Sequence, residues 1–294
     1  MRVFITGGSG FIGSAVIPEL VRSGHQVIAL ARSDDAARAV SANGAEPLRG
    51  SLEDLDSLRA GASKSEGVIH LGFVHDFANF EESLVIERNA VEAMCTALEG
   101  SERPLAIASG LLGLAPGRLA LETDTVPPAF RRGASEELLL AFAKRGVRTA
   151  IVRLSPTVHG AGDHGFVPLI IKAAREKGSS MYVGDGSARW PAVHRHDAAR
   201  LFRLALERAP AGSRLHAVAE EGIPTREIAE AIGRRANIPV VSGSIEAASA
   251  HMGFLGQLFA LDTPVSSKAT RELLGWNPTE LGLLEDIDRN YFAG

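Results

Sequence analysis

The chain has 294 residues, of which 45% are hydrophobic and 22% charged, with 31 basic and 35 acidic side chains and a formal net charge of −4. This composition is typical of globular proteins and excludes wholesale disorder, and it offers no basic excess for binding nucleic acid. No apolar run approaches the roughly 18 residues of a membrane helix, so we expect no membrane partner. The single cysteine, Cys95, excludes an internal disulfide, so we expect a protein of the reducing cytoplasm.

Short apolar strands alternate with amphipathic helices in the first half of the chain. The predicted strands are Arg2–Thr6, Gln26–Ala31, Glu46–Arg49, Gly67–Leu71, Leu105–Ser109 and Val147–Leu154. The predicted helices are Phe11–Arg22, Asp34–Asn43, a helix from near Asp54, Glu82–Leu98 and Ala134–Lys144. This alternation predicts βαβ units, and hence an α/β, Rossmann-type doubly wound parallel sheet of about six or seven strands.

The alternation weakens beyond Pro156, which indicates a change of architecture near Ser155. The helices predicted there are Val167–Lys177, Ala198–Arg208, Thr225–Arg235, Ser267–Leu274 and Leu281–Tyr291. A smaller, mostly helical C-terminal lobe is therefore expected.

A glycine-rich turn, TGGSGFIG at residues 6–13, joins the first strand to the first helix. Gly7 allows the tight turn, Gly10 lets the backbone approach phosphates, and Gly13 allows the helix to pack against the strand. The helix start then offers unpaired N–H groups and a positive dipole end to an anion. The alternative is a turn whose glycines serve only the packing of the helix against the strand. We predict a dinucleotide site that includes Gly7, Ser9, Gly10, Phe11, Ile12 and Gly13.

The end of the second strand bears on which dinucleotide binds. A carboxylate there would bind a ribose 2′-hydroxyl, whereas an arginine suits a 2′-phosphate. The chain has Arg32 and Ser33, which can pair with and donate to a phosphate. Arg32 can also be a solvated residue at a strand end, with Asp34 and Asp35 beside it. We predict NADP(H).

These motifs in this order resemble the extended short-chain dehydrogenases/reductases, which include the NAD(P)-dependent epimerases and dehydratases. The resemblance is also carried by VIHLG (68–72), ASG (108–110), VRLSPTVHG (152–160), GDG (184–186), WPAVHRHD (190–197), SK (267–268) and LLGWNP (273–278). It implies that Leu71, Gly72 and Phe73 bind the cofactor. It also implies an NADP-binding domain at 1–155 to which 193–217 return, and a substrate-binding lobe formed by 156–192 and 218–294.

The chain departs from this family at the catalytic pair. The family has a Tyr that donates a proton to the carbonyl, and a Lys four residues later that lowers its pKa and holds the ribose. Aligning the family's helix glutamate on Glu136 puts Arg132 at the Lys position and Pro128 at the Tyr position. We therefore predict that the pair is missing, as in atypical subgroups of the family. Arg132 can hold a ribose, but its guanidinium stays charged and cannot shuttle a proton.

Other side chains are candidates for the chemistry. Ser109 matches the family's substrate-polarising Ser or Thr after the fifth strand, although a serine there can also cap a turn. The candidate proton donors are His75 after the fourth strand, His159 after the sixth, Tyr182, and a relayed water. His194 is expected to be structural.

Arg189 and Trp190 flank a Gly-rich turn and, with Tyr182, are candidate substrate contacts. The alternative for Trp190 is a place in the core of the lobe. The spacing of the histidines does not put two ligands on one helical face, so we expect no metal site.

The expected function is that of an NADP(H)-dependent oxidoreductase of the carbonyl reductase or alcohol dehydrogenase type, acting on a small molecule. One alternative is an epimerase or dehydratase of a sugar nucleotide, which needs a competent acid/base pair. Another is a non-catalytic NADP(H)-binding regulator. The family usually dimerises through the helix pair that corresponds to Glu82–Leu98 and Ala134–Lys144 in this chain. The resemblance therefore implies a possible homodimer through these two helices.

Overall fold

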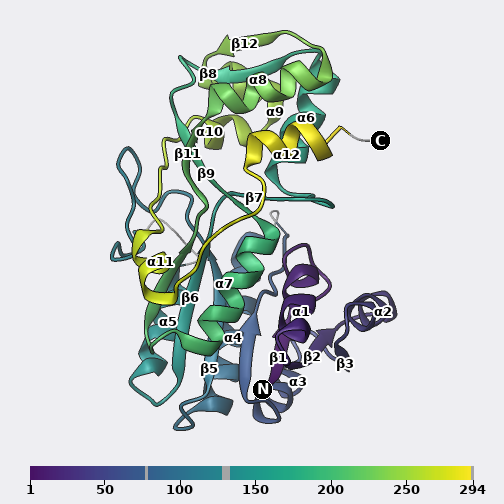
Figure 1. Ribbon diagram of the computed structural model, residues 1–294, viewed down its shortest axis with the longest axis vertical. Helices are drawn as coiled ribbons and strands as arrows, with labels where there is room; N and C mark the ends of the chain where they lie inside the picture. Colours follow the sequence, from purple (N-terminus) through teal and green to yellow (C-terminus); the bar gives the residue numbers. More distant parts are fainter. Residues whose placement is uncertain (77–78, 128–132, 293–294) are drawn as a thin grey trace.

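The computed structural model describes residues 1–76, 79–127 and 133–292, which form a larger lobe and a smaller lobe stacked along the longest axis (Figure 1). A parallel sheet of seven strands forms the centre of the larger lobe, in the order β10-β6-β5-β4-β1-β2-β3. In chain order the strands are β1 (Arg2–Thr6), β2 (Gln26–Ala31), β3 (Glu46–Arg49), β4 (Gly67–His70), β5 (Pro104–Gly110), β6 (Arg148–Leu154) and β10 (Ser213–Ala217). The predicted Rossmann-type fold is confirmed.

Helices cover both faces of this sheet. Their bounds are α1 (Gly13–Arg22), α2 (Asp34–Ala42), α3 (Leu55–Ser63), α4 (Phe80–Leu98), α5 (Gly133–Ala143) and α7 (Arg195–Arg208). Side chains of β1 alternate between the faces, so that Val3 and Ile5 join the core under α1 and α7 whereas Phe4 joins the core under α3, α4 and α5. Both faces are therefore buried, as the near-continuous apolar strands require.

The strand order reverses at β1, because the chain runs outward from β1 to β3 and then crosses back to β4 on the other side of β1. Ligands of open α/β sheets bind at the carboxyl edge beside such a reversal. A ligand site is therefore expected at the ends of β1 and β4.

The smaller lobe combines helices with short strands. Its elements are β7 (Thr157–His159), α6 (Phe166–Lys177), β8 (Ser180–Val183), β9 (Arg189–His194), β11 (Glu220–Pro224), α8 (Thr225–Ala236), β12 (Val240–Gly243), α9 (Ile245–Met252), α10 (Leu255–Phe259) and α12 (Leu283–Asn290). They include a three-stranded sheet, β11-β9-β7, and a pair, β12-β8. These strands and the helices α9 and α10 were not predicted, because segments this short carry little periodicity. Helix α11 (Lys268–Leu274) packs instead against β10 and α7 of the larger lobe (Figure 1). No helix in the described part of the chain has the length and apolar character to cross a membrane.

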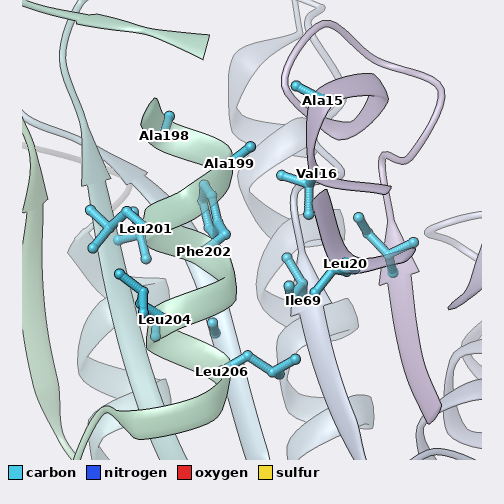
Figure 2. Close-up of a cluster of buried hydrophobic side chains, with 14 of the residues drawn as sticks. Ala15, Val16, Leu20, Ile69, Ala198, Ala199, Leu201, Phe202, Leu204 and Leu206 are labelled. Carbon is cyan, nitrogen blue, oxygen red and sulfur yellow. The ribbon is translucent and has the colours of Figure 1, made fainter. Parts of the chain in front are cut away.

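Residues 195–217 lie on the large sheet. Helix α7 packs beside α1, and β10 pairs with β6 at the sheet edge. Figure 2 shows Val16 and Leu20 of α1 and Phe202 of α7 gathered over Ile69 of β4. This contact holds together segments that are far apart in the sequence.

Replacing Phe202, a fully buried side chain of this core, tests the contact. Phe202→Ala should lower the free energy of unfolding by about 3–5 kcal/mol, because it removes buried apolar surface and leaves a cavity. Urea denaturation measures the change. Leu169→Ala is the control, because Leu169 is 41% exposed and its loss should change stability by no more than about 0.5 kcal/mol. Equal small effects in both variants would contradict this packing.

Candidate functional site

The glycine-rich turn lies between the end of β1 and the start of α1. Gly7 has a φ of +70°, and a Cβ on Gly7 would lie 2.7 Å from the backbone nitrogen of Gly72. A Cβ on Gly13 would lie 2.2 Å from the carbonyl oxygen of Gly7. The residue that precedes α1, Ile12, makes no side-chain capping hydrogen bond. The turn thus presents backbone N–H groups at the positive end of the α1 dipole. These donors and the shape of the turn fit a pyrophosphate.

The end of β4 is tied to the end of β1 beside this turn. Thr6 Oγ1 lies 2.7 Å from His70 Nδ1 and accepts a hydrogen bond from the Gly72 backbone N–H at 3.1 Å. Leu71 N–H donates to the Thr6 carbonyl at 3.2 Å. Leu71 and Phe73, with Gly72 between them, therefore lie next to the turn, and both are half-buried.

Arg32 follows β2 at the same edge of the sheet. It is exposed, and it makes no hydrogen bond or ion pair with the residues that the structure describes. Its acidic neighbours are already bound, Asp34 to Arg49 at 3.0 Å and Asp35 to Arg38. The next residue, Ser33, caps α2 by accepting a hydrogen bond from Ala36 at 3.2 Å.

Ser109 lies near the end of β5 and is 4% exposed. Its hydroxyl has no hydrogen-bond partner within the described ranges. A buried hydroxyl without a partner costs free energy, so such a group is a candidate for binding a ligand. Ser109 is the register partner of Arg153 on β6.

Arg153 forms a buried network that the sequence motifs did not predict. Its side chain is fully buried and donates to Glu136 of α5, with Nη2 2.7 Å from Oε2, and to the Asp124 carbonyl at 2.9 Å. It also approaches His216 Nε2 at 3.5 Å, while His216 Nδ1 donates to the Ser266 carbonyl at 2.8 Å. The available signal was a charged residue inside an otherwise apolar strand. Burial lowers the pKa of His216 to about 4, so this imidazole is neutral at pH 7.

The segment between Asp124 and Glu136 includes the positions that align with the family's catalytic Tyr and Lys, where we predict that the pair is missing. Pro128 and Arg132 lie outside the described residues, so the structure says nothing of their placement. The network fixes the two flanks of the segment instead. Asp124 is held by Arg153 and also by Arg118 at 2.8 Å, which lowers the pKa of Asp124 to about 2.

The two candidate histidines lie in different surroundings. His75 is exposed on the loop after β4, and its ring lies 5.2 Å from that of Phe73. His159 is fully buried in the smaller lobe, where Nδ1 lies 2.7 Å from Asp286 Oδ2 and the ring 5.3 Å from that of His194. The structure does not bring His75 and His159 together.

The three candidate substrate contacts, Tyr182, Arg189 and Trp190, also lie in different surroundings. Arg189 lines a hollow of about 520 Å³ and is bound to Asp262 through Nε at 2.9 Å and Nη2 at 2.8 Å. Trp190 is fully buried in the core of the smaller lobe and donates to the Leu258 carbonyl, which fits a core residue. Tyr182 of β8 is half-buried, with the guanidinium of Arg226 5.7 Å from its ring. Within the described part of the chain, no cluster of three or more His, Cys, Asp or Glu could hold a metal ion.

Comparison with known proteins adds to this geometry. A family model described as the NAD dependent epimerase/dehydratase family matches residues 3–218. An uncharacterised protein of Schizosaccharomyces pombe is 49% identical over 98% of both chains. The 4-hydroxy-2-methyl-3-oxo-4-farnesyl-3,4-dihydroquinoline-1-oxide ketoreductase of Stigmatella aurantiaca is 31% identical over 72% of this chain and 66% of its own. The fold matches a dTDP-glucose 4,6-dehydratase of Streptomyces venezuelae, solved with NAD bound, at a TM-score of 0.80 and 18% identity, covering 99% of this chain and 96% of that one.

The neutral state of His216 predicts a pH dependence of stability. Its pKa in the folded protein is below the ordinary value of 6.5, so the unfolded chain binds more protons between about pH 6.5 and 4, and stability falls as the pH falls through this window. Between pH 7 and pH 5 the loss due to His216 should be about 2 kcal/mol. Urea denaturation at both pH values should show a drop smaller by that amount in His216→Asn. The exposed His164→Asn, as control, should behave like the wild type, and a wild-type drop in His216→Asn would contradict this account.

Proposed function

The chain belongs to the NAD dependent epimerase/dehydratase family, and from this premise we propose that it is an NADP(H)-dependent oxidoreductase that reduces a small carbonyl compound. Membership confirms the resemblance seen in the sequence motifs and makes a nicotinamide dinucleotide the expected cofactor. The observation that carries the proposal is the buried, unpartnered hydroxyl of Ser109 within the described chain, at the same sheet edge as the glycine-rich turn. When bound, the cofactor would supply the hydride.

The order of the strands supports this arrangement of the site. Along the carboxyl edge, β2, β1, β4 and β5 are consecutive neighbours at about 4.8 Å each. Arg32, the turn, Leu71–Gly72 and Ser109 therefore follow one another in a row. In the proposal, Arg32 and Ser33 bind a 2′-phosphate, the turn binds the pyrophosphate, and Ser109 binds the substrate.

The chain's own residues have two tasks in this reaction. Ser109 Oγ donates a hydrogen bond to the carbonyl oxygen and stabilises the negative charge that develops there. His75, exposed at the same edge, or a water that it relays, delivers the proton. His159 fits this task less well, because Asp286 holds its ring in a fully buried place.

The usual Tyr–Lys pair has no part in the proposal. The chain's tyrosines are Tyr182 and Tyr291. Both belong to the smaller lobe, and the hydroxyl of Tyr291 already donates to Asp163 Oδ2 at 2.5 Å. Burial raises the pKa of Tyr291 above its ordinary range, so this phenol stays protonated. Arg132 remains a predicted ribose ligand outside the described residues.

In the proposal the substrate extends into the hollow at Arg189, and the charges of this hollow favour an uncharged substrate over a sugar nucleotide. A diphosphate needs cations, but Arg189 is committed to Asp262, and Asp185 adds a second carboxylate to the same hollow. A relative that is a ketoreductase agrees with reduction of a carbonyl. We also propose a cytoplasmic protein and a homodimer through α4 and α5, where Val85 is 48% exposed.

NADPH oxidation by the purified protein, measured against a panel of aldehydes and ketones, tests the function. Turnover of at least one of them supports a reductase. Epimerases and dehydratases return the hydride to the substrate and consume no NADPH overall, so sugar nucleotides are assayed separately by chromatography of the products. Conversion of sugar nucleotides alone would favour the epimerase or dehydratase. NADPH binding without turnover of any compound would favour the regulator.

Replacing Arg32 tests the choice of cofactor. Arg32→Ala should weaken NADPH binding about 10- to 100-fold, because charge-assisted hydrogen bonds to the 2′-phosphate are lost, and should change NADH binding by no more than about twofold. Fluorescence titration measures both dissociation constants. Arg38→Ala is the control, because Arg38 is bound to Asp35. Equal losses of NADPH and NADH affinity would contradict a 2′-phosphate site at Arg32.

Replacing Ser109 tests the chemistry. Ser109→Ala should lower kcat about 100- to 1,000-fold, the usual effect of losing one donor to a developing oxyanion, and should leave the Kd for NADPH unchanged. Ser155→Ala is the matched control, because Ser155 is equally buried at the end of β6 but its hydroxyl donates to Ala217. A wild-type kcat in Ser109→Ala would remove Ser109 from the site.

A further inference from the structure

Arg195 lies against the glycine-rich turn although it is distant from it in the sequence. It is the first residue of α7, and its guanidinium carbon lies 5.2 Å from the centre of the Phe11 ring. On the same ring, His164 packs edge-on with 5.7 Å between the centroids. The start of α7 and the loop after β7 thus both contact the turn through Phe11.

Arg195 has no anionic partner among the residues that the structure describes. Its Nε is buried and makes no hydrogen bond there. Two other arginines of α7 are paired, Arg200 with Glu280 at 2.8 Å and Arg203 with Glu19 at 2.8 Å and Glu207 at 2.9 Å. A buried donor without a partner is costly, so the position of Arg195 calls for an acceptor.

Nearby carboxylates do not fill this need. Asp197, two residues along α7, binds Arg200 and accepts from the backbone N–H groups of Thr279 and Glu280. Asp163, in the loop that passes Arg195, accepts from the Tyr291 hydroxyl and from the Gly165 N–H. Both acids are satisfied elsewhere.

The electrostatics of this place favour an anion. The start of α1 carries a positive dipole end, and so does the start of α7, where a basic residue is unfavourable without a counter-charge. Arg195 adds a full positive charge at the start of α7, against Phe11 of the turn. Three sources of positive potential therefore surround the turn, and a doubly charged pyrophosphate would relieve their mutual repulsion.

We propose that Arg195, beside the glycine-rich turn, binds the pyrophosphate of the dinucleotide together with the backbone of the turn. The inference rests on the proposed dinucleotide site and adds a ligand from the β9–α7 junction. One set of oxygens accepts from the backbone N–H groups of the turn, and the guanidinium donates to the other. Since NADPH and NADH share the pyrophosphate, Arg195 strengthens the binding of both, whereas Arg32 acts on the 2′-phosphate alone.

The test compares wild type with Arg195→Met, which keeps the length and apolar packing over Phe11 but removes the charge. Titrations with NADPH, NADH, ADP-ribose and adenosine 2′-monophosphate give the dissociation constants. The first three probes contain a pyrophosphate, and each should bind about 10- to 100-fold more weakly to Arg195→Met. The last probe lacks a pyrophosphate and should bind unchanged. Arg195→Lys, which keeps the charge but not the planar fork, should be intermediate.

Arg203→Met is the matched control, because Arg203 lies on the same helix and is paired with Glu19 and Glu207. It should bind all four probes like the wild type, and melting temperatures check that each variant is folded. The wild-type Kd for NADPH should rise more steeply with salt than that of Arg195→Met, which a packing role would not produce.

Several results would overturn the inference. If folded Arg195→Met binds the three pyrophosphate probes like the wild type, Arg195 is not a pyrophosphate ligand. If in that variant only the KM of a carboxylated carbonyl substrate rises, the anion at Arg195 belongs to the substrate. Failure of the wild type to bind either dinucleotide would instead overturn the proposed function, so the two failures are distinguishable.

Discussion

The close approach of backbone segments at the glycine-rich turn is the constraint on which the arrangement of this protein depends. With a Cβ at Gly13 the helix would meet the Gly7 carbonyl at 2.2 Å, and with one at Gly7 the turn would meet Gly72 at 2.7 Å. Contacts this short exclude any side chain. Because these glycines lack side chains, α1 can start directly above β1 while the end of β4 lies alongside. The lack of side chains also leaves the backbone N–H donors at the start of α1 accessible to a ligand.

A second constraint acts deeper in the sheet, at Arg153. Its guanidinium joins β6 to Glu136 of α5, to the Asp124 carbonyl and to His216 of β10. A charge buried this completely is tolerated only when its partners are all in place. The network therefore fixes α5 against β6, the strand that pairs with β5 and carries the register partner of Ser109. It does so through residues that need not touch a ligand.

Charge is distributed unevenly between the carboxyl edge of the large sheet and the hollow at Arg189. At the cofactor edge Arg32 and Arg195 have no acidic partner in the described chain, whereas Asp34 and Asp35 are bound to other arginines. In the smaller lobe the reverse holds, because Arg189 is bound to Asp262. Free positive charge thus gathers where a dinucleotide would lie and is absent from the hollow at Arg189. This division accords with the proposed anionic cofactor at the edge of the sheet.

Local patterns in the sequence determined the larger part of the fold. The alternation of apolar strands and amphipathic helices predicted β1 to β6 with their helices, and the glycines predicted the turn, because both signals depend on residues a few positions apart. Only the tertiary structure decided that Trp190 is a core residue and that Arg189 binds Asp262, 73 residues away. It likewise decided that His159 is held by Asp286, 127 residues away, and that Arg195 lies on Phe11 with no carboxylate partner among the described residues. Such pairings follow from the order of strands and the packing of lobes, which bring distant segments together, and periodicity along the chain does not record them.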